Sequence, residues 1–327
     1  MYSSLFYYFG LGALLREWND LDMAERHLVQ GMALVKETLT VEPFVAVSGY
    51  AALARLRQAH GNSRGALATL DTLEHLAEQR HFPSHLMSQV AAVRAQLELA
   101  QGNLAAALHR ADTSGLSAGD EDLGYPREGE YPALVRVRIA QARDDPATSL
   151  PQEVLHLLDR LLRDAEVKAR LGSVLEILIV RALAQEAQGN RTSSLSTLER
   201  ALLLAAPEGY IRLFVDEGAP MLTLLRQAHR RSRAPGYVAT LLSAFGEQNI
   251  SNLPPSSARH SPLAEALTER EREVLRSLPE GASNREIARR LVVSVNTVKR
   301  HVYNLCGKLG VQSRAQATVH ARDLNLL

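Results

Sequence analysis

Amphipathic helical stretches and short polar turns alternate along most of the chain. Similar turn motifs begin at Asn19, Gly61, Gly102 and Gly189; the first three lie 42 and 41 residues apart and the last follows after 87. That long interval leaves room for one degenerate unit near Asp144. Small residues recur twelve positions apart on the two sides of each turn, in the pairs Gly12 and Ala24, Ala54 and Ala66, Ala95 and Ala107, and Ala182 and Ser194. Small residues at both places let two helices approach closely, so the pattern predicts an array of helical hairpins.

A separate helical pattern runs from Ser294 to Gly310. Ser294 is suited to cap the start of a helix, and Gly310 is suited to end it in a left-handed conformation. Apolar residues recur between them at steps of 3, 4, 3 and 4, at Val295, Val298, Val302, Leu305 and Leu309. Asn296, Arg300, Tyr303 and Gly307 fall on the opposite side, with Lys299 at its margin. A helix with one apolar side and a donor-rich opposite side is suited to a DNA major groove.

Three capping boxes lie around this helix. Thr268–Glu271 and Ser283–Glu286 pair a hydroxyl with a carboxylate, and Ser313–Gln316 has Gln in place of the acid. Helix Asn284–Leu291 would carry Ile287, Ala288 and Leu291 inward, and only two valines separate it from the cap at Ser294. The chain is therefore predicted to be all-α, a tetratricopeptide-like α-solenoid followed by a four-helix domain with a helix-turn-helix at its centre.

The stretch Gln248–Pro262 lacks hydrophobic periodicity and is rich in Pro and Ser. It divides the chain into a repeat domain at 1–246, a linker at 247–262 and a DNA-binding domain at 263–327. Pro, Gly and acidic residues predict breaks inside the array at Ala118–Pro132 and Asp216–Pro220, with Pro220 opening a helix.

The net charge is +1 for the chain, but its distribution is uneven. From Leu263 onward there are 11 Lys and Arg against 7 Asp and Glu, a balance of +4, and the remainder has 26 against 29, a balance of −3. The C-terminal part is the one expected to attract phosphate.

The single cysteine, Cys306, excludes an internal disulfide and favours a reducing, cytoplasmic location. The apolar run Leu5–Leu15 is too short to span a bilayer and lacks the flanks of a signal peptide, so a buried helix and no membrane partner are expected. The printed sequence holds no phosphate-loop motif, no zinc-ligand cluster and no serine-hydrolase motif. We therefore expect no cofactor, no metal and no enzymatic activity.

The four blocks LTEREREVL, GASNREIARRL, VSVNTVKRHVYNLCGKLGV and SRAQATVHARDLNLL occur in order and resemble the LuxR-type helix-turn-helix of bacterial transcription regulators. The resemblance implies that the helix at residues 295–309 enters the major groove of double-stranded DNA. Lys299, Arg300 and Tyr303 would face base edges, while Thr297, Asn304 and Lys308 would lie near phosphates. Asn296 and Arg314 complete the candidate DNA-binding residues.

The helix after Ser313 carries small apolar residues at Ala315, Ala317, Val319, Ala321 and Leu324. In the resembling family this helix pairs two DNA-binding domains, which implies a weak homodimer that forms mainly on DNA, with Val319 or Ala321 at the contact. The alternative is that these residues complete the core of one domain.

The array resembles tetratricopeptide repeats with a somewhat longer period. GLGALLREWNDLDMAERHL and LERALLLAAPEGYIRLFVDEGAPMLTLL resemble more closely the superhelical sensor region of MalT-like, ATP-binding LuxR regulators, over roughly Tyr7 to Phe245. That resemblance implies a small-molecule or protein effector on the array and RNA polymerase as a partner. In such proteins a nucleotide-binding module precedes the array.

Three functional hypotheses remain open. The chain is a DNA-binding transcription regulator with a sensing array, an interaction scaffold that has lost DNA binding, or a fragment of a signal-dependent ATPase regulator. The intact donor face at Lys299, Arg300 and Tyr303 argues against the scaffold. The other two hypotheses assign the same roles to the residues of this chain and differ in what precedes Met1.

Overall fold

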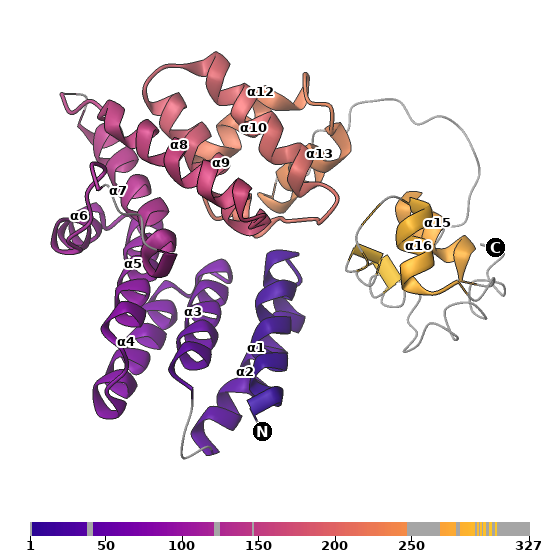
Figure 1. Ribbon diagram of the computed structural model, residues 1–327, viewed down its shortest axis with the longest axis horizontal. Helices are drawn as coiled ribbons and strands as arrows, with labels where there is room; N and C mark the ends of the chain where they lie inside the picture. Colours follow the sequence, from indigo (N-terminus) through magenta and orange to yellow (C-terminus); the bar gives the residue numbers. More distant parts are fainter. Residues whose placement is uncertain are drawn as a thin grey trace. The chain divides into compact units, whose positions relative to one another are not determined.

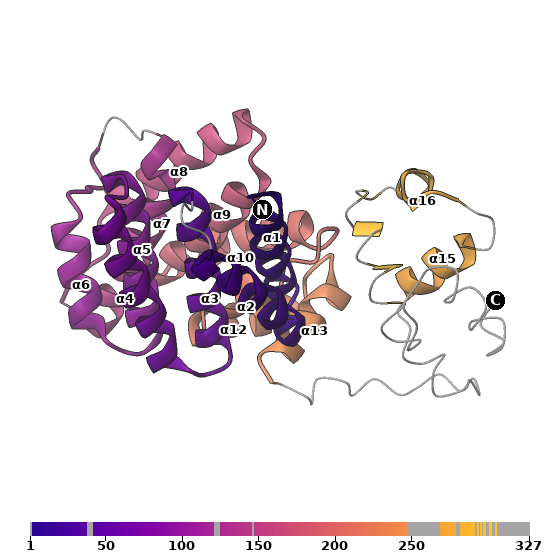
Figure 2. The same cartoon turned by 90° about the horizontal axis from the view of Figure 1, so that it is seen from below.

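The computed structural model describes residues 2–37, 42–120, 125–145, 147–246, 269–278 and 282–291, together with 293, 295, 297, 298, 301, 302 and 305. Figure 1 and Figure 2 show the described segments in two views; they form helices and contain no strand. The chain divides into two compact units, one comprising Met1–Leu203 and Tyr210–Glu247 and the other comprising Leu204–Gly209 and Gln248–Leu327. The predicted all-α class is confirmed.

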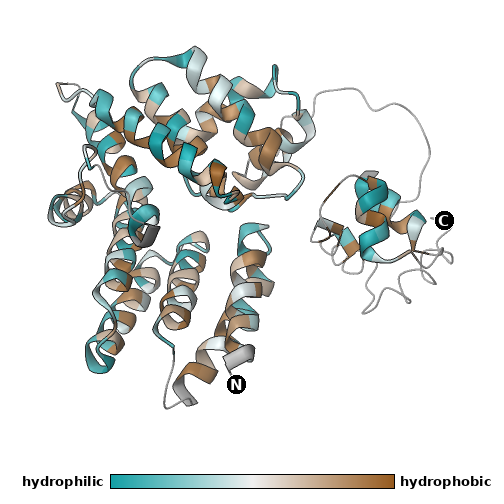
Figure 3. Cartoon of the chain, in the orientation of Figure 1, coloured by the Kyte–Doolittle hydropathy of each residue, from teal (hydrophilic) through white to brown (hydrophobic). Residues whose placement is uncertain are grey.

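The first unit is a succession of helices joined by short turns. Its elements are α1 (Tyr2–Glu17), α2 (Leu21–Glu37), α3 (Pro43–Ala59), α4 (Ser63–Arg80), α5 (Ser84–Ala100), α6 (Leu104–Thr113), the 3-10 helix η1 (Tyr125–Glu130), α7 (Tyr131–Asp144), α8 (Gln152–Val167), α9 (Leu171–Ala187), α10 (Arg191–Ala205), α11 (Arg212–Val215), α12 (Ala219–His229) and α13 (Pro235–Ala244). Consecutive helices pack in pairs, α1 with α2, α3 with α4, and α5 with α6. Figure 3 shows hydrophobic positions recurring along these helices and hydrophilic positions gathering at the turns.

The predicted turns have the backbone conformation that their Gly and Asn residues favour. Asn19, Gly61, Gly102 and Gly189 all have positive φ, between 62° and 79°. The asparagine after each glycine then caps the next helix, as where Gly65 N donates to Asn62 Oδ1 at 2.9 Å. The Gly-Asn pair thus ends one helix and begins the next, which explains the recurrence of the motif.

The small residues lie at the predicted helix contacts. Ala54 and Ala66 are both completely buried. A Cβ added at Gly12 would lie 2.6 Å from Leu28 Cγ, which leaves no room for a larger residue unless Leu28 moves. In the last hairpin the hydroxyl of Ser194 donates to the carbonyl oxygen of Ala182 at 2.8 Å. The twelve-residue register of the hairpins is therefore confirmed.

The region around Asp144 differs from the expected hairpin. Helix α7 ends there, but it packs against α5, α6 and α9, while α8 pairs with α9 across a turn at Ala169, whose φ is 53°. Within the predicted break Ala118–Pro132, residues 125–130 form η1. The break at Asp216–Pro220 is confirmed, since α11 ends at Val215 and Pro220 lies in the first turn of α12. The predicted linker at 247–262 lies outside the described residues, so the domain boundaries stay predictions.

Candidate nucleic-acid interface

The second unit contains α15 (Glu269–Ser277), α16 (Asn284–Leu291) and helical residues between 295 and 305. These elements meet in one small hydrophobic core formed by Val274, Leu275, Leu278, Ala282, Ile287, Ala288, Val298 and Leu305. Ile287 and Ala288 are buried and Leu291 packs against the core, as the pattern in α16 predicts. The core therefore fixes α16 and the following helix against α15.

The start of α16 has the reciprocal hydrogen bonds of a capping box. Ser283 N donates to Glu286 Oε2 at 2.6 Å, and Glu286 N donates to Ser283 Oγ at 3.3 Å. These bonds with Ser283 hold the pKa of the Glu286 carboxyl below its ordinary value. The capping box predicted from Ser283–Glu286 is confirmed, whereas Thr268 and Ser313–Gln316 lie outside the described residues.

The helix proposed to read DNA turns one side into the core. Val298 and Leu305 are completely buried, and Val295 and Val302 pack against them. Four of the five residues of the predicted apolar stripe thus lie on the inner side, and Leu309 is outside the described residues.

Among the candidate DNA-binding residues, the structure describes only Thr297. This residue is 2% exposed, and its hydroxyl donates to the carbonyl oxygen of Pro207 at 2.9 Å. The other candidates lie outside the described residues; they are Asn296, Lys299, Arg300, Tyr303, Asn304, Lys308 and Arg314. Their contacts with DNA stay predictions.

Two arginines on α16 were not assigned from the sequence. The side chains of Arg285 and Arg289 are exposed, on the helix that precedes the proposed recognition helix. The signal that reveals them is the helical period, because Ile287 and Ala288 occupy the core side and leave residues 285 and 289 outside. Exposed guanidinium groups in this place are suited to phosphate contacts.

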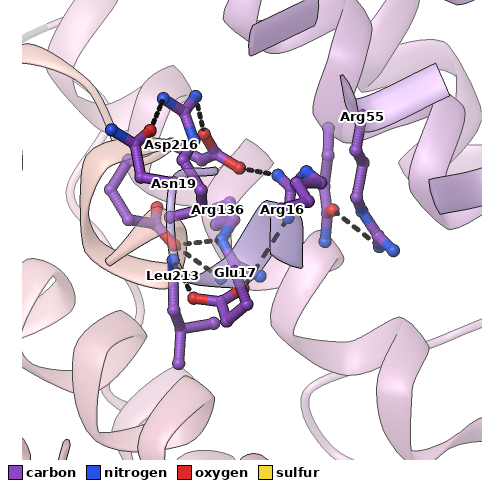
Figure 4. A network of polar contacts seen from close by, with 10 residues as sticks. Arg16, Glu17, Asn19, Arg55, Arg136, Leu213 and Asp216 are labelled. Atoms are coloured by element: carbon purple, nitrogen blue, oxygen red, sulfur yellow. Dashed lines mark hydrogen bonds and ion pairs between the residues drawn. The ribbon is translucent and has the colours of Figure 1, made fainter. Parts of the chain in front are cut away.

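The array has a polar cluster that joins segments almost 200 residues apart, shown in Figure 4. Ile211 N donates to the carbonyl oxygen of Glu17 at 2.9 Å, and Leu213 N donates to the Glu17 carboxylate at 2.7 Å. Arg16 pairs with Asp216 beside them. The end of α1 is therefore bound to α11, close to the other end of the array.

Two half-buried arginines lie near this cluster, Arg136 on α7 and Arg55 on α3. The Arg136 guanidinium donates to Glu217 and Glu176, at 2.8 Å in each case. Burial acts to lower the pKa of Arg136, but the two carboxylates raise it above its ordinary value. Arg55 has no carboxylate as a hydrogen-bond acceptor among the described residues: its Nη2 donates to Gln96 Oε1 at 3.5 Å. Burial lowers the pKa of its guanidinium group. The cluster thus links α1, α7, α9 and the segment at 211–217, while the Arg55 bond joins α3 to α5.

Comparison with known proteins follows the division into an array and a C-terminal helical unit. Residues 2–231, more than half of the chain, match the family model described as MalT-like TPR region. The chain belongs to the MalT-like family. Residues 265–321 match the model described as bacterial regulatory proteins, luxR family. Both resemblances drawn from the sequence motifs are therefore confirmed.

Individual relatives of this MalT-like chain include proteins named HTH-type transcriptional regulator MalT from two strains of Klebsiella pneumoniae and from Cronobacter sakazakii. Each is 29% identical over 333 residues, covering 95% of this chain and 35% of the relative. The chain thus spans about a third of the length of the curated relatives it matches.

Two further observations concern the part of the MalT-like chain that the structure describes. None of its helices is long and apolar enough to cross a membrane. The described residues also contain no group of three or more His, Cys, Asp or Glu side chains placed to hold a metal ion.

Proposed function

We propose that the chain is a sequence-specific DNA-binding transcriptional regulator, with the recognition helix at residues 295–309 in the major groove. The observation that carries the proposal is the burial of Val298 and Leu305, with Val295 and Val302 packed against the same core. In a regular helix this places positions 296, 300 and 303 on the opposite side, the side free for a groove. The match to the luxR family over residues 265–321 supports the same role.

The side chains divide by chemistry into base readers and phosphate contacts. Lys299, Arg300 and Tyr303 carry donors that reach base edges, with Asn296 beside them on the same face. Asn304, Lys308 and Arg314 contact phosphates. The Thr297 hydroxyl is buried, so its phosphate contact comes from the main-chain N–H near the start of the helix.

The exposed arginines of α16 extend this surface. Arg285 and Arg289 lie on the helix that crosses the DNA backbone in helix-turn-helix proteins. Their charge adds to the sequence-independent part of the affinity and to its dependence on salt.

Operator selection from random duplex DNA with the full chain tests the proposal. We expect one enriched sequence. Arg300→Ala should relax the preference at one base pair, at a cost of about 1–3 kcal/mol there. Lys308→Ala should weaken all sequences about equally and reduce the salt slope by about one. Arg64→Ala, an exposed site on α4, is the control and should bind like the wild type.

If the folded protein enriched no sequence, the proposal would be overturned. That result would also favour the alternative, an interaction scaffold that has lost DNA binding. If Arg300→Ala kept the wild-type sequence preference, Arg300 would not be a residue that reads a base.

The array is proposed to sense a small-molecule or protein effector and to pass that signal to the DNA-binding domain. RNA polymerase is the proposed partner at the promoter, and the cytoplasm is the proposed location. The relatives are named HTH-type transcriptional regulators, which supports the regulatory role in this proposal. The alternative of a fragment of a signal-dependent ATPase regulator assigns the same functions to these residues.

A further inference from the structure

The chain from α12 to the end of α13 carries arginines and no acidic residue. Residues 218–246 contain four Arg and no Asp or Glu, whereas residues 1–217 contain 21 Lys and Arg against 28 Asp and Glu, a balance of −7. Helices α12 and α13 pack against each other (Figure 1), and the turn between them holds Arg230, Arg231 and Arg233. All three are exposed, and together they are called the basic turn.

The fold does not use these guanidinium groups to hold the turn. Main-chain bonds close it, since Arg231 N and Ser232 N donate to the carbonyl oxygen of Ala228 at 2.9 and 2.8 Å. Arg233 N donates to Glu199 Oε1 at 2.7 Å, so the main chain also occupies an oxygen of the acid that contacts the turn. None of the three guanidinium groups forms an ion pair or hydrogen bond with the residues that the structure describes. The basic turn therefore presents three positive charges to the solvent.

The end of a helix attracts cations, and this effect accounts for part of the pattern. Arg226 and His229 lie in the last turn of α12, where the helix dipole favours positive charge. The effect falls off within that turn, so it does not extend to Arg231 and Arg233. A negatively charged partner would account for the charge beyond the helix.

The surroundings of the basic turn indicate which kind of anion it fits. Protein partners are held by aromatic and apolar anchors, and residues 219–246 include no large exposed hydrophobic side chain. Bases of single-stranded nucleic acid stack on aromatic rings. The nearest aromatic residue, Tyr237, is turned into the array: its ring contacts Phe214 with centroids 6.1 Å apart, and its hydroxyl donates to the carbonyl oxygen of Tyr210. Exposed guanidinium groups without such anchors fit the phosphates of a double helix.

A double helix bound by the C-terminal domain would lie within reach of the basic turn. Helix α13 and the predicted linker at 247–262 separate the two. The 16 residues of that linker extend to at most about 55 Å. One turn of the double helix measures about 34–36 Å, so phosphates beside the sequence that the domain reads are close enough for a second contact.

We propose that the basic turn is a second DNA-binding surface, on the array, which contacts backbone phosphates of duplex DNA beside the sequence read by the C-terminal domain. The contact is independent of sequence, since phosphates carry no sequence information. It raises the affinity for sites within long DNA and makes that affinity more dependent on salt. The inference rests on the proposed DNA-binding function and extends it to the array.

Salt titrations of the full chain on two duplexes test the proposal. The short duplex holds only the selected sequence, in about 20 base pairs or two helical turns, and the long one adds random flanks to reach about 60 base pairs. Fluorescence anisotropy gives the affinity at each salt concentration. We expect the salt slope of the wild type to be steeper on the long duplex, by about 2–3 for three neutralised phosphates.

Two triple variants assign this extra slope to the basic turn. The first changes the turn itself, with Arg230→Gln, Arg231→Gln and Arg233→Gln. It should lose the extra slope of about 2–3 on the long duplex and bind the short duplex like the wild type. The control should keep the wild-type slope on both duplexes. It removes the same charge from exposed positions on α2 and α4, with Arg26→Gln, Arg64→Gln and Arg80→Gln.

A folded basic-turn variant with the wild-type slope on the long duplex would overturn the proposal. Equal loss on both duplexes would also overturn it, because the effect would not come from flanking DNA. Loss of affinity for a single-stranded RNA of the same length, with unchanged affinity for the long duplex, would reject DNA as the partner.

The failure of this inference can be told apart from the failure of the proposed function. If selection enriches no sequence, a random duplex of the same length replaces the long one. A lower salt slope in the basic-turn variant would then support the turn while sequence-specific binding is rejected. If a sequence is enriched and the variant keeps the wild-type slope, the basic turn alone is rejected.

Discussion

The ionisation of Glu17 affects the stability of the array. Burial is the largest cause that raises the pKa of its carboxyl, from 4.5 to about 7, and Arg16 and the Leu213 N–H oppose that change. Since the folded-state pKa is raised, the folded protein holds the proton more tightly than the unfolded chain does. The stabilisation is present below pH 4.5 and is lost as the pH rises through about 7.

We therefore predict that the free energy of unfolding falls between pH 4.5 and 7, by about 1.4 kcal/mol for each unit of pKa shift. Glu17→Gln keeps an acceptor for Leu213 N and cannot ionise, so its profile should be flatter. Urea denaturation of both proteins across this range measures the difference. Glu78→Gln, an exposed site on α4, controls for the loss of a carboxylate. Parallel profiles for the wild type and Glu17→Gln would contradict the assignment.

At the scale of the elements, the packing of α3 on α4 gives a second prediction. Ala54 is completely buried where these helices approach. Ala54→Leu should overpack the hairpin and destabilise the protein by about 1–3 kcal/mol. Thermal unfolding measures the effect, with Ala68→Leu on the exposed side of α4 as the control. A wild-type melting temperature in Ala54→Leu would mean that this contact tolerates the larger side chain.

The elements differ in how far the sequence could predict them. Turns at Gly61, Gly102 and Gly189 were predictable because a Gly-Asn pair specifies both the end of one helix and the start of the next. The turn at Ala169 has neither residue, so the pairing of α8 with α9 was missed. The contacts of Glu17 with residues 211 and 213 depend on packing across the whole array, which local patterns do not encode.

At the scale of the whole molecule, we predict that two copies of the chain pair on DNA. One helix-turn-helix contacts few base pairs, whereas two domains on half-sites about one helical turn apart discriminate better. Ala321, outside the described residues, is predicted to lie at the contact. Ala321→Glu should stay folded and lose affinity for a paired site more than for a single half-site. Gel shifts at fixed salt compare the two sites, and Ala68→Glu is the matched surface control.

Equal loss of affinity on both sites would place Ala321 in the core of one domain. In that case the alternative interpretation of the last helix, in which its alanines complete the core, would be correct. Equal affinity of the variant and the wild type on the paired site would remove Ala321 from the proposed contact.

The bond between α1 and α11 has a consequence for how the array unfolds. In a repeat protein with free ends, the terminal repeat contacts one neighbour and frays first. Here loss of α1 would also break the contacts that Glu17 and Arg16 make with the segment at 211–216. Amide hydrogens at the end of α1 should then exchange with solvent no faster than those of the segment at 211–216.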